Sequence, residues 1–149
     1  MNRKSSRRNK LLLDTPFLLP TLGFETSKRI INALPKLRKY ELYYSDLSIL
    51  EALWKIIKKI RGTEEEIKRI KEGIAAIRET MNTVTISEEA VQKAIEMYLL
   101  GHRDMVDNLL YSIALTQELK LLTIDTKLLR FVKNKKFPAH PIALPEELE

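Results

Sequence analysis

The stretch LLLDTPFLL at residues 11–19 decides how this chain is interpreted, because a short apolar run ends there at an acid, Asp14. Further along, LKLLTID at residues 119–125 repeats the pattern and ends at Asp125. Apolar runs this short, separated by helical stretches, are typical of buried strands in a parallel sheet. Ligands of such sheets bind beyond the carboxyl ends of the strands. Two strands that each carry a carboxylate to that edge therefore predict a cation site.

The expected strands and helices alternate along the chain. Thr63 and Glu66 form a capping box that should begin one of the helices. Strands that alternate with helices predict an α/β sandwich with a mostly parallel sheet. The expected strands are 10–14, 40–45, 82–87, 120–124 and an edge strand at 139–144, and the expected helices are 26–38 with an interruption near Pro35, 46–61, 64–80, 87–100, 103–119 and 126–133.

Composition excludes several classes of protein. The 149 residues contain no cysteine, which rules out disulfides and thiolate chemistry and fits a cytoplasmic location. No apolar run approaches the ~20 residues needed to cross a bilayer, so we expect no membrane partner. The chain has neither a GxGxxG nor a GxxxxGK[ST] motif, which argues against a nucleotide-phosphate cradle.

The net charge of +6 is concentrated at the beginning of the chain. Residues 1–10 carry five basic side chains and no acid, and without them 21 basic residues face 20 acidic ones. A basic arm binds nucleic acid by neutralising phosphates and releasing counterions, although it can also serve as a solvated terminus. We therefore expect a flexible basic arm at residues 1–9 and a single domain at residues 10–149. The candidate nucleic-acid-binding residues are Arg3, Lys4, Arg7, Arg8 and Lys10.

Two helical acids lie in apolar surroundings. On a helical wheel, Asp107 falls at the edge of the apolar face of the expected 103–119 helix. Glu51 has Leu47, Leu50 and Trp54 around it. Taken singly, Asp107 could also be a solvated or helix-N-terminal acid, and Glu51 could pair with Lys55 four residues later.

Considered together, the four acids indicate a metal site. Asp14 and Asp125 follow strands, whereas Glu51 and Asp107 lie in early turns of helices that adjoin strands. Four carboxylates at one edge would repel one another and need a divalent cation to coexist. All-oxygen ligands favour Mg²⁺ or Mn²⁺ over zinc. Such cations activate water and stabilise the leaving oxygen in phosphodiester cleavage.

In these four acids and the residues around them, the chain resembles the PIN-domain ribonucleases and is similar to the VapC-type toxins of toxin–antitoxin pairs. The resemblance runs from about residue 10 to residue 144 and rests on four motifs in order. They are LLLDTPFLL at 11–19, SDLSILEAL at 45–53, RDMVDNLLYSIAL at 103–115 and LLTID at 121–125.

The resemblance implies a three-layer α/β/α sandwich with a central five-stranded sheet and an acidic pocket for Mg²⁺ or Mn²⁺. It makes Asp14, Glu51, Asp107 and Asp125 the catalytic and metal-holding residues. Thr15 and Thr123 become supporting hydroxyls, and Asp104 becomes an additional acid. Pro16 departs from the Asn that often stands there in the family, which removes an amide proton and a polar side chain.

The leading hypothesis is a metal-dependent endoribonuclease that acts on RNA and is the toxin of a toxin–antitoxin pair. As a toxin it would have an antitoxin protein as its partner. The surplus apolar residues of the 46–61 and 64–80 helices, in a region that mediates dimers in similar proteins, predict a homodimer. Pro16 and the basic arm support an alternative, a non-catalytic nucleic-acid-binding or scaffold module with a degenerate pocket. A DNA nuclease with the same acids is a third hypothesis.

Overall fold

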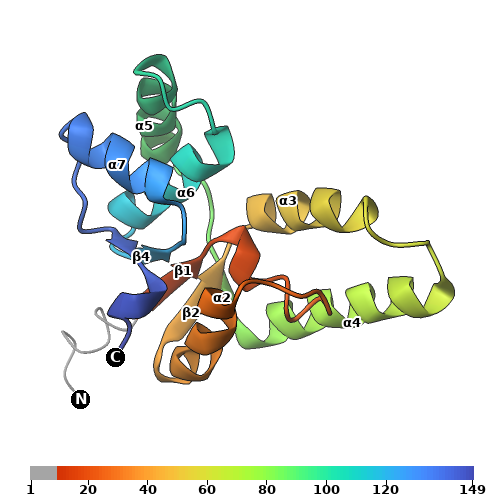
Figure 1. Cartoon of the computed structure of the whole chain (residues 1–149). Helices are drawn as coiled ribbons and strands as arrows, with labels where there is room; N and C mark the ends of the chain where they lie inside the picture. Colours follow the sequence, from red (N-terminus) through yellow and green to blue (C-terminus); the bar gives the residue numbers. More distant parts are fainter. Residues whose placement is uncertain (1–9) are drawn as a thin grey trace.

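A five-stranded, wholly parallel sheet forms the centre of the protein (Figure 1). The computed structural model describes residues 10–149, so the predicted nucleic-acid-binding residues Arg3, Lys4, Arg7 and Arg8 lie outside the described residues. The strand order is β3-β2-β1-β4-β5, which places the strands that precede Asp14 and Asp125 next to each other. The strands are β1 (Lys10–Leu13), β2 (Glu41–Tyr44), β3 (Asn82–Thr83), β4 (Lys120–Leu122) and β5 (Ile142–Ala143).

Helices cover both faces of the sheet, which gives the three layers that the resemblance implied. Successive side chains of a strand point to opposite faces, and β1 shows this directly. Leu11 and Leu13 pack in one hydrophobic core, whereas Leu12 packs in the other. The helices are α2 (Lys28–Ala33), α3 (Asp46–Ile57) and α4 (Glu64–Thr80) around the first core, and α5 (Glu88–Leu99), α6 (Met105–Thr116) and α7 (Thr126–Asn134) around the second.

Local chemistry explains where several helices begin. The predicted capping box is present, because the Thr63 hydroxyl accepts from the Glu66 N–H and the Glu66 carboxylate accepts from the Thr63 N–H. Acids of the proposed site cap two further helices: Asp104 caps α6 and Asp125 caps α7. In Figure 1, α3 and α4 project from the sheet in the same direction. None of the helices formed by residues 10–149 is long and apolar enough to cross a membrane.

Two of the differences between the predicted and the observed element boundaries have identifiable reasons. The expected 26–38 helix is α-helical only at Lys28–Ala33 and continues as a 3-10 helix at Leu34–Lys39, where Pro35 lacks the N–H of a regular turn. The expected 82–87 strand ends at Thr83, because its neighbour β2 ends at Tyr44, whose carbonyl accepts from the Val84 N–H.

Candidate functional site

The carboxyl ends of β1 and β4 are joined by a hydrogen-bonded chain through the side chains of Asp14 and Thr123. Asp14 is buried, and its Oδ1 accepts from the Thr15 N–H at 2.8 Å while its Oδ2 accepts from the Thr123 hydroxyl at 2.7 Å. The Thr123 oxygen in turn accepts from the Asp125 N–H at 3.0 Å. The predicted supporting role of Thr123 therefore has a structural basis, because its hydroxyl orients one acid and holds the backbone of another.

Burial dominates the electrostatics of Asp14. Loss of solvent raises the pKa of its carboxyl from 3.8 to about 6, although the hydrogen bonds from Thr123 and Thr15 act in the opposite direction. The negative charges of Glu51 and Asp125 raise this pKa further. Glu51 is half-buried in α3, and its effect on Asp14 places it at the same end of the sheet.

Asp107 and Asp125 form a coupled pair of carboxyls. Burial raises the pKa of Asp107 far above its ordinary value, and its hydrogen bond with Asp125 and the charge of Asp14 raise it further. For Asp125, burial acts upward, but the hydrogen bond with Asp107 and those from the Leu128 and Lys127 N–H groups outweigh it and lower the pKa. The two pKa values move in opposite directions because the same hydrogen bond raises one and lowers the other.

The structure brings together the four acids that the sequence predicted. Asp14 interacts with Glu51 and Asp125, and Asp107 interacts with Asp14 and Asp125. Asp107 is only 7% exposed, which excludes the solvated alternative for this residue. Asp104 is exposed and contributes differently, since its Oδ1 accepts from the Asp107 N–H at 3.1 Å and so fixes the start of α6.

The other predicted residues contribute less directly. Thr15 supplies its N–H to Asp14, whereas its buried hydroxyl has no hydrogen-bond partner among the described residues. Pro16 occupies an early position of a 3-10 turn at Thr15–Phe17, where proline is well tolerated, and it leaves the contacts of Asp14 intact. Lys10 lies at the start of β1, at the opposite end of that strand from Asp14.

Sequence reasoning missed the polar side chains that surround the acids. A hollow of about 550 Å³ is lined by Asp104, Asp107 and Asp125 and also by His102, Arg103 and Lys127. His102 Nδ1 lies 2.7 Å from the Oδ1 of buried Asn108, and the amide of Asn108 donates to the His102 carbonyl, so the imidazole is held in place. Arg103 and Lys127 could have been found, because each lies within two residues of a motif acid.

The oxygen atoms that converge at this site are the type of ligand that a hard divalent cation prefers. The converging ligands are carboxylate oxygens, which Mg²⁺ and Mn²⁺ prefer, and their mutual repulsion is what a cation relieves. Thr15 adds a buried hydroxyl without a partner beside Asp14. Within residues 10–149, however, no three His, Asp or Glu side chains are close enough together to hold a metal ion.

Fold and site together define an α/β/α protein with an acidic pocket at the carboxyl edge of a parallel sheet. The chain belongs to the PIN domain family, whose model matches residues 11–134. No curated protein matches the sequence. The match to the family model confirms the family that the motifs predicted.

Solved structures show the same fold at low sequence identity. FitAcB from Neisseria gonorrhoeae is 16% identical with a TM-score of 0.63, over 93% of this chain and 99% of its own. A toxin–antitoxin complex from Klebsiella pneumoniae has the same identity and TM-score, over 91% and 97%. VapC20 from Mycobacterium tuberculosis, described as a toxin that cleaves the sarcin-ricin loop, is 17% identical with a TM-score of 0.56, over 87% and 97%.

Proposed function

We propose that this chain is a metal-dependent endoribonuclease that hydrolyses phosphodiester bonds of RNA. The observation that carries the proposal is the burial of Asp14 beside the carboxyl groups of Glu51, Asp107 and Asp125 at one end of the sheet. Burial of this kind costs free energy unless a partner or a cation compensates the charge, and perturbed carboxyls in a hollow are typical of functional sites.

Each acid has a role in this proposal. Asp14, Asp107 and Asp125 would hold Mg²⁺ or Mn²⁺, and Glu51 would ligate it or orient the attacking water. When bound, such a cation lowers the pKa of water and stabilises the leaving oxygen. Thr123 fixes the orientation of Asp14 through its hydroxyl. Arg103 and Lys127, which line the same hollow, supply the positive charge that a scissile phosphate requires.

The test is cleavage of a labelled RNA with Mn²⁺, Mg²⁺ or EDTA, by the wild type and by Asp14→Asn. We expect cleavage that needs the metal and disappears in the variant. An Asp46→Asn variant is the matched control, because Asp46 is an exposed acid whose ion pair is with Arg78. Cleavage in EDTA, or full activity of Asp14→Asn, would refute the proposal. Preferential cleavage of single-stranded DNA would favour a DNA nuclease, and no cleavage of either would favour a scaffold module.

We also propose that the protein is the toxin of a toxin–antitoxin pair and forms a homodimer. Complexes of this kind are among the structural neighbours. The outer face of α3 supports a protein partner, because Trp54 is 62% exposed and Ile57 is 68% exposed. Leu50 and Leu53 extend this apolar face at helical spacing. A short DNA-binding protein that is encoded upstream and copurifies with this chain would support the antitoxin proposal.

A further inference from the structure

The charge of the carboxyl-terminal part of the chain is strongly one-sided. Residues 126–145 contain five basic side chains and no acid, although residues 11–149 as a whole are almost neutral. Residues 126–145 are thus a second concentration of positive charge besides the basic arm, although 21 basic and 20 acidic residues nearly cancel over residues 11–149. The five cations are Lys127, Arg130, Lys133, Lys135 and Lys136.

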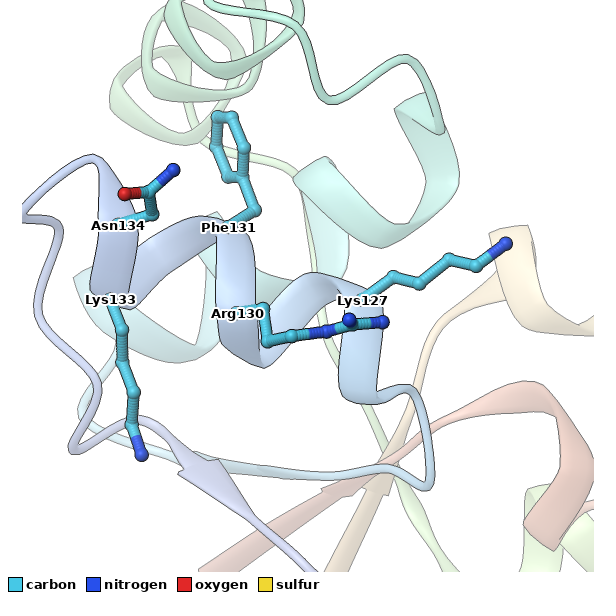
Figure 2. Close-up of a pocket in the computed structure, with 5 residues that line it drawn as sticks. All are labelled: Lys127, Arg130, Phe131, Lys133 and Asn134. Atoms are coloured by element: carbon cyan, nitrogen blue, oxygen red, sulfur yellow. The ribbon is translucent and has the colours of Figure 1, made fainter.

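Helix α7 places three of these cations around one surface hollow. Leu128 and Val132 face inward and are buried in the second core. Lys127, Arg130 and Lys133 are exposed and line a hollow of about 790 Å³ together with Phe131 and Asn134 (Figure 2). Residues three apart on a helix are neighbours, so the cations form one row along the outer face of α7.

The hollow on α7 lies next to the hollow at the acidic site. Lys127 lines both hollows, so the row of cations starts where the acids of the site lie. The ring of Phe131, which lines the basic hollow, is 5.1 Å from the ring of His102, which lines the acidic one. In Figure 2 the side chains of Lys127 and Arg130 run in the same direction, away from Phe131.

The cations of α7 form no ion pair with the described part of the chain. Within residues 10–149, the ion pairs join Arg29 to Glu146, Lys68 to Glu72 and Arg78 to Asp46, and none involves α7. A row of exposed cations without carboxylate partners binds an anion with repeated charges far better than a single anion.

We propose that the outer face of α7 binds the sugar-phosphate backbone of single-stranded RNA and guides the strand into the acidic site. Lys127 binds the phosphate nearest the acids, and Arg130 and Lys133 bind successive phosphates further along. A single row of cations on one helix contacts one backbone, which favours a single strand over a duplex. The inference deepens the proposed function, because it names the surface that holds the substrate of that site.

The test measures binding apart from cleavage. Fluorescence anisotropy of a labelled single-stranded RNA oligonucleotide is recorded in EDTA for the wild type and for R130E/K133E. The matched control is K59E/K71E, which makes the same charge change at exposed positions after α3 and in α4. Because single-stranded binding has a salt slope of about 0.7 per phosphate, losing two contacts should flatten the slope by about 1.4. The advantage of the wild type over R130E/K133E should then shrink about sevenfold between 50 and 200 mM salt.

The outcomes separate the two proposals. Weaker RNA binding by R130E/K133E but not by K59E/K71E supports the α7 surface, even if no preparation cleaves RNA with Mn²⁺. Equal weakening in both variants, or none, overturns the α7 surface, even if the wild type is an active nuclease. Equally tight binding of duplex DNA at this surface would also overturn it. R130Q/K133Q, which removes charge without reversing it, should also weaken RNA binding, but by less than R130E/K133E. Thermal unfolding checks that both variants are folded.

Discussion

The burial of Asp14 predicts that metal-free protein loses stability as the pH rises. Its pKa is about 6 in the folded protein and 3.8 as the ordinary value, so the folded state holds the proton more tightly. A carboxyl with a raised folded pKa contributes stability below its unfolded pKa and loses it as the pH rises through the folded value. The shift corresponds to about 3 kcal/mol, lost mainly between pH 4 and pH 7.

Asp14→Asn isolates this contribution, because asparagine stays neutral. The variant keeps an oxygen that can accept from the Thr15 N–H but loses the acceptor of the Thr123 hydroxyl, which costs about 1 kcal/mol. At pH 8 in EDTA, we therefore expect the variant to be more stable than the wild type by about 2 kcal/mol. At pH 4 the order should reverse, because both side chains are then largely neutral and only the lost hydrogen bond remains.

Urea denaturation followed by circular dichroism at several pH values measures the difference. Adding Mn²⁺ at 100 times its dissociation constant should stabilise the wild type by about 2.7 kcal/mol and the variant by much less. The comparison between the two proteins cancels the titration of the shared groups that do not interact with Asp14. A difference in unfolding free energy that does not change between pH 4 and pH 8 would refute the assignment of a buried, charge-strained Asp14.

Three further predictions concern other residues of the site and the surface. Glu51→Gln should lower metal-dependent RNA cleavage about 100- to 10,000-fold without changing the folded structure, as measured by single-turnover kinetics and circular dichroism. Thr123→Val should reduce the free energy of unfolding by about 1–3 kcal/mol, because Asp14 loses a donor and the Asp125 N–H loses an acceptor, whereas the same change at exposed Thr126 should have little effect. In light scattering, the wild type should be a dimer and W54E/I57E a monomer; an unchanged mass would contradict a dimer through α3.

The sequence was sufficient to predict the architecture because the signals that define it are local. Short apolar runs, capping residues and helical spacing predicted the alternation of strands and helices, and the five-stranded sheet confirms it. The convergence of Asp14 and Asp125 followed from their positions after strands. Glu51 and Asp107 were predicted only in combination with the two strand-end acids, since each alone also fitted an ordinary helical surface.

Features that depend on neighbours in space could not be predicted in the same way. The length of β3 is set by where β2 ends, and the pKa of Asp14 is set by how completely the folded chain removes water from it. The basic row on α7 was missed for a different reason. The domain has 21 basic and 20 acidic residues, so its net charge is close to zero although one segment of 20 residues contains no acid.

The single proton of the Thr123 hydroxyl has a consequence for communication across the sheet. The hydroxyl gives that proton to Asp14 while its oxygen receives the Asp125 N–H, so its rotation has one preferred setting. Because Asp125 also caps α7, this hydroxyl contacts both the carboxyl at the end of β1 and the residue that begins the cationic helix. The same side chain therefore ties one strand end to the start of the helix at the next.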